Sequence, residues 1–153
     1  MNRPDAIVIR PMDLSDLDAV LAIEQASYPT PWLRDHFLNE IEAQHSFPFV
    51  AIVEATVAGY LCMMSLFEEA QLLNIAVASR LRGSGIARQL MAHAMNTAFE
   101  HGAEFMALEV RASNLAAIAL YESLGFVRTG TRQHYYDGKE DAVLMEKTLQ
   151  GAN

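Results

Sequence analysis

The sequence predicts an α/β fold, in which helices accompany a mixed sheet of seven strands. Two observations support this prediction. First, short apolar runs alternate with segments of helical period in the order β-α-α-β-β-β-α-β-α-β-β. Second, a strand, a long helix and another strand follow one another within residues 70–111, and such a β-α-β unit joins parallel strands. A chain of 153 residues is long enough for one domain with its own core, so we expect a single domain over residues 1–153.

The individual elements follow from period and from the residues that end each segment. Pro29 and Pro31 separate two early helices, and Gly102 and Gly125 end two later ones. Asp137-Gly138 predicts a hairpin turn between the last two strands. The expected strands are 7–10, 47–53, 56–65, 70–77, 105–111, 126–136 and 139–149, and the expected helices are 15–27, 32–43, 85–101 and 114–124.

Composition narrows the class of protein. Hydrophobic residues make up 52% and charged residues 20%, and no apolar run approaches the length of a membrane helix, so we expect no membrane segment. The N-terminus lacks the apolar stretch of a signal peptide, and the lone Cys62 lies in an apolar strand, where a buried inert thiol is expected. These features favour a cytoplasmic protein, and the net charge of −8 disfavours direct nucleic-acid binding. The oligomeric state is open, and a monomer is favoured.

The segment from Arg82 to Arg88 contains two glycines and lies between an apolar strand and a long helix. Glycine lets the backbone approach a ligand, and the first N–H groups of the helix then point at that ligand. A phosphate-bearing ligand is therefore expected, the alternative being an ordinary glycine-containing turn. Neither the nucleotide-triphosphate loop nor the dinucleotide fingerprint fits this spacing.

Two motifs identify a family. Arg82-x-x-Gly85-x-Ala87 resembles the pyrophosphate-binding motif of the GCN5-related N-acetyltransferases, with alanine where a second glycine is common. Residues 109–114 (Glu-Val-Arg-Ala-Ser-Asn) and 117–126 resemble the bacterial ribosomal-protein-alanine acetyltransferases of the RimI type. The segments 23–25, 31–32, 74–77 and 135–142 match that subfamily as well, so the resemblance covers nearly the whole chain.

The resemblance implies a mostly antiparallel sheet in which the fourth and fifth strands are parallel and splay apart to admit acetyl-CoA. It implies direct acetyl transfer, without a metal, to the α-amine of a protein that begins with alanine, most simply a small-subunit ribosomal protein. Backbone groups of the fourth strand would hold the pantetheine arm and the oxyanion. The cofactor-binding residues it implies are Ile75, Ala76, Val77, Arg82, Gly83, Ser84, Gly85, Ile86, Ala87, Arg88 and Asn114.

Glu109 and Tyr121 are the candidate catalytic residues. Strand alternation places Glu109 on one face with Ala107 and Arg111, and a carboxylate in mid-strand is unusual, so Glu109 is the expected proton acceptor. The alternative is an ion pair with Arg111 or a solvated sheet face. Tyr121 follows Asn114 by about two helical turns and is the expected acid toward the leaving thiol, the alternative being a core tyrosine.

The acceptor site is expected at Glu24, Trp32, Tyr135 and Tyr136, which lie in segments that line the peptide groove in related enzymes. Alternation sends Tyr135 and Tyr136 to opposite faces, and Trp32 would be either a groove wall or a staple for the second helix. The five histidines show no metal-ligand spacing. Two rival functions remain: the same fold acting on a lysine or a small amine, and a non-catalytic acyl-CoA-binding module.

Overall fold

The computed structural model describes residues 6–136 and 138–150. The elements follow the expected order, with two short 3-10 turns added. The strands are β1 (Val8–Pro11), β2 (Ser46–Val53), β3 (Thr56–Leu66), β4 (Glu69–Val77), β5 (Phe105–Arg111), β6 (Val127–Tyr136) and β7 (Glu140–Thr148). The helices are α1 (Leu17–Ser27), α2 (Arg34–Glu42), α3 (Ile86–Glu100) and α4 (Leu115–Ser123), with the 3-10 turns η1 (Leu14–Asp16) and η2 (Ser79–Leu81).

The strands form a sheet in the order β1-β2-β3-β4-β5-β7-β6. The start of β4 runs parallel to β5, with Glu69 opposite Phe105, whereas the other pairings whose register is known are antiparallel. The expected mixed sheet with a central parallel β-α-β unit is therefore confirmed. The chain divides into two compact units, one of Met1–Met64 with Leu73–Ala94 and one of Ser65–Leu72 with Met95–Asn153.

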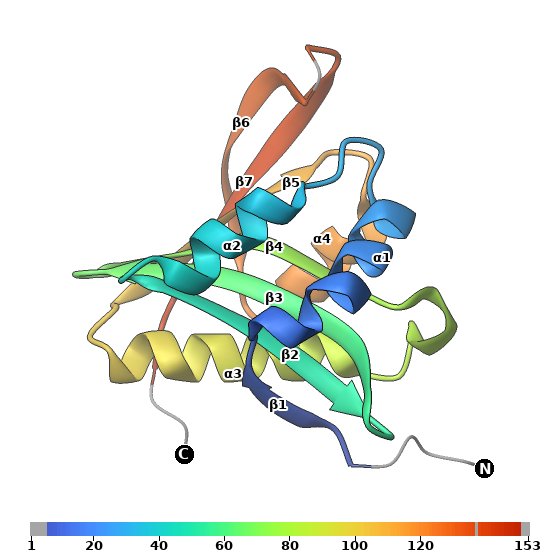
Figure 1. Cartoon of the computed structure of the whole chain (residues 1–153). Helices are drawn as coiled ribbons and strands as arrows, with labels where there is room; N and C mark the ends of the chain where they lie inside the picture. Colours follow the sequence, from blue (N-terminus) through green and yellow to red (C-terminus); the bar gives the residue numbers. More distant parts are fainter. Residues whose placement is uncertain (1–5, 137, 151–153) are drawn as a thin grey trace. The chain divides into compact units, whose positions relative to one another are not determined.

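The first unit has helices on both faces of its strands. Alternate residues of β2 and β3, such as Val50 and Tyr60, are fully buried in one core cluster with Val20 of α1 and Phe37 of α2. On the opposite face, the ring of Phe49 lies 4.6 Å from that of His93 on α3. Figure 1 shows α1 and α2 on one side of β2 and β3 and the first part of α3 on the other side.

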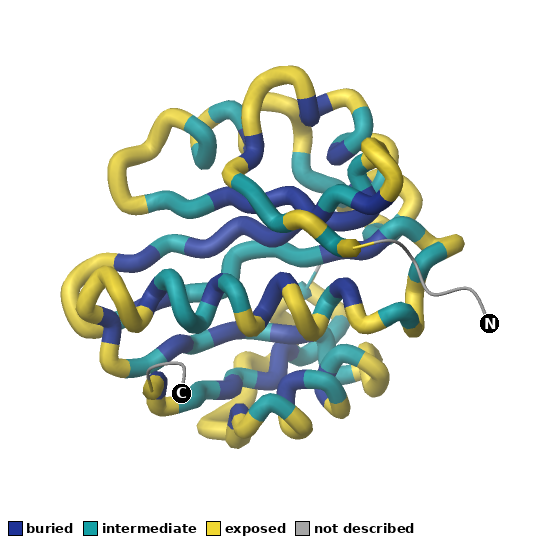
Figure 2. Tube along the Cα trace, turned by 90° about the horizontal axis from the view of Figure 1, so that it is seen from below, coloured by how far each residue is buried: buried dark blue, intermediate teal, exposed yellow. Residues whose placement is uncertain are grey.

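Helix α3 illustrates how the apolar period produces this packing. Its buried residues recur at helical spacing, at Ile86, Leu90, Met91, Ala94 and Ala98. In Figure 2, buried and exposed parts accordingly alternate along the helix. Cys62 is also fully buried, as expected, and burial raises the pKa of its thiol above the ordinary value.

The second unit is built on the hairpin of β6 and β7 and the pairing of β7 with β5. Met106, Leu108 and Val110 of β5 are buried and the residues between them are half-buried, which confirms the expected alternation. Asn114 caps α4, because its side-chain oxygen accepts a hydrogen bond from the Ala117 N–H at 3.2 Å. Of the predicted Asp137-Gly138 turn, Asp137 lies outside the described residues.

Both early helices are shorter than expected. The segment predicted as a helix from residue 15 begins with η1, and α1 starts only at Leu17, because Asp13 and Asp16 form a reciprocal capping box around η1. The second helix starts at Arg34, so Trp32 precedes it. The Leu33 N–H donates to the Nδ1 of His36 at 2.9 Å, which caps the helix two residues later than the sequence suggested.

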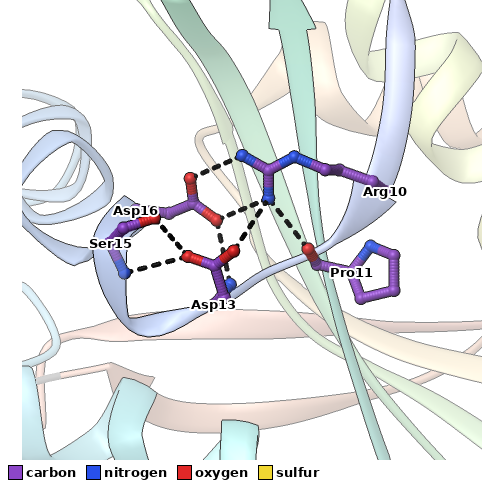
Figure 3. A network of polar contacts seen from close by, with 5 residues as sticks. All are labelled: Arg10, Pro11, Asp13, Ser15 and Asp16. Carbon is purple, nitrogen blue, oxygen red and sulfur yellow. Dashed lines mark hydrogen bonds and ion pairs between the residues drawn. The ribbon is translucent and has the colours of Figure 1, made fainter.

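A partly buried ion pair connects β1 to η1 (Figure 3). The two terminal nitrogens of Arg10 donate to the two carboxylate oxygens of Asp16, each at 2.8 Å. The Asp16 side chain is only 5% exposed and also accepts from the Asp13 N–H at 2.9 Å. The hydrogen bonds from Arg10 outweigh burial and lower the pKa of Asp16 below its ordinary value of 3.8.

We expect Asp16→Asn to lower the free energy of unfolding by about 2 kcal/mol at pH 7, because it removes the charged group that both terminal nitrogens of Arg10 bind and leaves the more distant Asp13, at 3.7 Å. A carboxylate whose pKa is lower in the folded state stabilises the fold above its unfolded pKa and loses that effect as the pH falls. The difference between wild type and variant should therefore shrink below about pH 4. Urea unfolding of both proteins at pH 7 and pH 3 measures this, and an equal difference at both values would contradict it.

Candidate functional site

The loop between β4 and α3 contains the predicted glycine-bearing turn from strand to helix. Gly83 and Gly85 have φ angles of 84° and 85°, which side-chain-bearing residues rarely adopt. A Cβ built at either position meets nothing within 4 Å, so the glycines are needed for conformation rather than for space. Helix α3 begins at Ile86 directly after this turn, and the first N–H groups of a helix have no partner within it. The role of this loop in binding a phosphate group remains a prediction.

Arg82 of the same loop contacts protein groups. Its Nε donates to the Val77 carbonyl at 3.3 Å, and a terminal nitrogen donates to the Ser27 hydroxyl at 3.2 Å. Ser27 in turn donates to the Ile23 carbonyl at 2.6 Å. Arg82 therefore connects the loop to the end of β4 and to the end of α1, which the sequence motif did not indicate.

The end of β4 is held from two further sides. The Tyr28 hydroxyl donates to the Ile75 carbonyl, and the Ala78 N–H donates to the Ala58 carbonyl at 2.8 Å. A Cβ built at Gly59 would lie 2.9 Å from the carbonyl oxygen of Ala76, so only glycine permits this close approach of β3 and β4. Sequence reasoning missed Gly59, although a glycine inside a strand is a known indication of close backbone approach.

We expect Gly59→Ala to lower the free energy of unfolding by about 1–3 kcal/mol, because backbone rather than a flexible side chain must move to accept the methyl group. Gly130→Ala is the matched control, since a Cβ there meets the Leu144 side chain at an ordinary 3.5 Å. The control should be unchanged or up to about 1 kcal/mol more stable. Thermal unfolding of the two variants tests the comparison, and equal midpoints would contradict it.

Glu24, an expected acceptor-site residue, lies in the core of the first unit. It is 1% exposed, and its carboxylate accepts from the Trp32 N–H at 2.8 Å, the Asn74 side-chain amide at 2.7 Å and the Tyr60 hydroxyl. Burial and the Glu24 carboxylate raise the pKa of Tyr60, so the phenol stays protonated and donates. Glu24 therefore joins α1, the segment before α2, β3 and β4.

Trp32 packs as a staple for the second helix. Its ring lies 5.1 Å from the Phe37 ring and 5.7 Å from the His36 ring, both on α2. Trp32 is half-buried and packs against the core that contains Phe37. These contacts explain its position after the two prolines, and they leave open a second role at the acceptor site.

Glu109 is half-buried on β5, as its place in the strand predicted. Its carboxylate pairs with Arg132 of β6, with 3.1 Å between Oε1 and the arginine Nε, and 29% of its side chain is exposed. Arg111, the partner suggested by the sequence, has a guanidinium nitrogen 3.3 Å from a carboxylate oxygen of Glu140 on β7. The sequence missed Arg132, since the facing residue depends on a strand register that a single chain does not reveal.

Tyr135 and Tyr136 of β6 were predicted to face opposite sides of the sheet, and this prediction is wrong. Their ring centroids lie only 5.1 Å apart. The cause is an irregularity in β6. Arg132 pairs with Ala142 and Tyr136 with Glu140, so three residues of β6 stand opposite Asp141 alone. His134 in this bulge has φ 53°, and its N–H donates to the Asp141 carboxylate at 2.9 Å. Tyr135 is 49% exposed and Tyr136 is half-buried.

The guanidinium of Arg111 lies over the ring of Tyr136. The guanidinium carbon of Arg111 lies 4.3 Å from the centroid of the Tyr136 ring. Burial, followed by the Glu109 carboxylate, raises the pKa of Tyr136 to about 12. At neutral pH its phenol is therefore protonated and is a hydrogen-bond donor.

Tyr121 of α4 is buried, with 4% of its surface exposed, and its ring lies 5.9 Å from that of Phe126. The Phe126 N–H donates to the Tyr121 carbonyl at 3.0 Å, which closes the end of α4 around Gly125. These contacts show the core packing of the ring, and its role toward a thiol remains a prediction. Asn114, seven residues earlier, serves as the helix cap described above.

Within residues 6–136 and 138–150, the structure shows no group of three or more His, Cys, Asp or Glu side chains placed to hold a metal ion. In the same described ranges, no helix is both long enough and apolar enough to cross a membrane.

Comparison with known proteins agrees with this fold. The model of the acetyltransferase (GNAT) family matches residues 17–126. The [ribosomal protein bS18]-alanine N-acetyltransferase of Escherichia coli is 36% identical over 140 residues, which cover 90% of this chain and 94% of that protein. The N-alpha-acetyltransferase of Saccharolobus solfataricus is 32% identical over 154 residues, covering 92% of each.

Solved structures give the same result. The crystal structure of the Escherichia coli ribosomal-protein-S18-alanine N-acetyltransferase superposes with a TM-score of 0.88 at 34% identity, covering 97% of both chains. The Ard1 structure from Thermoplasma volcanium also gives a TM-score of 0.88, at 27% identity, covering 95% of this chain and 99% of that one. The family and fold expected from the motifs are thereby confirmed, and this chain belongs to the acetyltransferase (GNAT) family.

Proposed function

We propose that this protein transfers an acetyl group from acetyl-CoA to the α-amine of the N-terminal alanine of the small-subunit ribosomal protein bS18. The observation that carries the proposal is the 36% identity, over 90% of this chain, to the Escherichia coli enzyme named for that reaction. A ribosomal substrate places the reaction in the cytoplasm. We also propose that both compact units belong to one acetyltransferase domain, because the matched residues 17–126 include parts of each.

Acetyl-CoA supplies an activated thioester, and the residues of this chain bind and orient it. The backbone of Gly83–Arg88 at the start of α3 would hold the pyrophosphate, supported by the left-handed glycines and the helix N-terminus. Backbone groups of Ile75, Ala76 and Val77 would hold the pantetheine arm. The N–H of Val77 or Ala76 would donate to the acetyl carbonyl oxygen as negative charge develops there. Arg82, which follows η2, and Asn114, which caps α4, would also contact the cofactor.

Glu109 and Tyr121 would move the protons. The amine nitrogen attacks the acetyl carbon, Glu109 accepts the proton that the amine loses, directly or through a water, and the carbon–sulfur bond breaks. Tyr121 gives a proton to the sulfur of the leaving thiolate. The half-buried position of Glu109 supports its role, because such a carboxylate is accessible yet held in place by Arg132. No acyl-enzyme step is needed, and Cys62 is fully buried.

An α-amine needs less help from a base than a lysine side chain does. Its pKa is about 7.7–8.0, so roughly one molecule in seven is neutral at pH 7, whereas a lysine with a pKa of about 10.4 is neutral in only about one of a few thousand. We propose that Trp32, Tyr135, Tyr136 and Glu24 belong to the acceptor side. For Tyr136, the support is its protonated phenol beside the bulge; Glu24 is enclosed by three donors and would act by shaping that side.

Mass spectrometry of two peptides with acetyl-CoA tests the proposal. One peptide carries the free N-terminal sequence of bS18 from the same organism, and the other is blocked at that terminus but keeps a lysine. We expect acetylation of the free terminus alone. Acetylation of the blocked peptide would move the enzyme to the lysine class, and binding of acetyl-CoA without turnover of either peptide would favour a non-catalytic acyl-CoA-binding module.

A further inference from the structure

Glu140, the first residue of β7, binds two segments of the second unit at once. One carboxylate oxygen accepts the Ser113 N–H at 2.9 Å and also the Ser113 hydroxyl. The other oxygen accepts from a terminal nitrogen of Arg111 at 3.3 Å. The bonds from Ser113, then that from Arg111, lower the pKa of Glu140, so the carboxylate is ionised at neutral pH.

The Ser113 contact holds the start of α4. Ser113 immediately precedes Asn114, whose side chain caps the helix, and the Asn114 N–H donates to the Arg111 carbonyl at 2.9 Å. Because α4 is only nine residues long, the placement of its first turn determines where Tyr121 lies. The two hydrogen bonds that Ser113 donates to Glu140 therefore orient α4, which is capped by Asn114 and carries Tyr121.

The Arg111 contact holds the ring of Tyr136. The planar guanidinium that Glu140 binds at one nitrogen lies with its carbon 4.3 Å from the centroid of that ring. A guanidinium paired with a carboxylate loses rotational freedom, so the ring stacked on it is restricted as well. Glu140 thus acts on the acceptor side through Arg111 and on the cofactor side through Ser113.

We propose that Glu140 is a positioning residue that places the ring of Tyr136 on the acceptor side and the start of α4 on the cofactor side together. A role in stability alone is a poorer account, because partly exposed ion pairs contribute little to folding, and here the side chains of Arg111 and Glu140 are 22% and 28% exposed. The proposal rests on the proposed function for the roles of Tyr136, Asn114 and Tyr121.

Three variants separate the two contacts. Ser113→Ala removes a hydroxyl bond to Glu140, Arg111→Met removes the cation, and Glu140→Gln replaces one accepting oxygen by an amide that cannot accept. We expect Ser113→Ala to weaken acetyl-CoA binding about 3- to 10-fold with little change in the KM for peptide. We expect Arg111→Met to raise the KM for peptide about 3- to 10-fold with little change in acetyl-CoA binding. Glu140→Gln should change both constants. Glu146→Gln, the same charge change on the same strand, is the control and should change neither.

Calorimetric binding of acetyl-CoA, steady-state KM for the bS18 peptide and the thermal midpoint are measured for each variant. A Glu140→Gln protein with a lower midpoint but both constants as in wild type would overturn the proposal. So would single-contact variants that each change both constants equally, because that pattern means general loosening. If wild type modifies no peptide terminus, the proposed function fails separately, and acetyl-CoA binding to Glu140→Gln and Ser113→Ala still decides the contact with α4.

Discussion

Glu109→Gln is expected to lower kcat for the bS18 peptide by about 100- to 10,000-fold while leaving acetyl-CoA binding unchanged. The amide has the size of the carboxylate but cannot accept the proton that the attacking amine loses, and a positioned base contributes a factor in this range. The fold should survive, because Glu109 is half-buried rather than enclosed and its ion pair with Arg132 is partly exposed. Single-turnover acetylation followed by mass spectrometry measures the chemical step.

Glu122→Gln provides the matched control. Glu122 also pairs with the Nε of an arginine, Arg128, at 3.8 Å, but both of those side chains are more than half exposed. Losing that pair should change neither kcat nor stability by a measurable amount. If Glu109→Gln raised only the KM for peptide and left kcat intact, Glu109 would bind the amine rather than accept its proton.

The fold was largely predictable because its evidence is local. The alternation Met106, Leu108 and Val110 predicted the buried face of β5, and Asn114 with Gly125 predicted both ends of α4. Gly83 and Gly85 predicted a turn between a strand and a helix, and both lie in such a turn, with positive φ angles. In each case the residue type itself has the conformational preference, so the local sequence is sufficient to predict the structure.

The site was less predictable because its contacts join distant segments. Glu24 binds Tyr60 and Asn74, which lie 36 and 50 residues away, and Glu140 binds Ser113 from 27 residues away. The bulge that brings Tyr135 against Tyr136 depends on the side chain of Asp141 holding the His134 N–H. A prediction from strand period alone assumes that β6 is regular, and it therefore places the two rings on opposite faces.

Glu24→Ala is expected to lower the free energy of unfolding by about 3–5 kcal/mol, a large part of the stability of a domain of this size. The change removes an acceptor from three donors, the Trp32 N–H, the Asn74 amide and the Tyr60 hydroxyl, and Tyr60 is fully buried. Unpaired buried donors lose their hydration without compensation, and the removed side chain leaves a cavity. Urea unfolding monitored by fluorescence of Trp32 measures the loss.

Glu40→Ala is the control for that loss, because Glu40 on α2 is half-buried and its carboxylate accepts from Ser46 at 2.6 Å, so a change of about 1 kcal/mol is expected. Glu24→Gln then separates structure from recognition. The Gln carbonyl oxygen can replace the oxygen that accepts from both Tyr60 and Asn74, which leaves only the Trp32 N–H facing the amide nitrogen, so this variant should lose less stability than Glu24→Ala. If Glu24 acts through its three partners, the KM for peptide should rise in step with the loss of stability across the two variants. A raised KM in Glu24→Gln at wild-type stability would mean that the carboxylate itself meets the substrate amine, and its burial would then have to be relieved when the peptide binds.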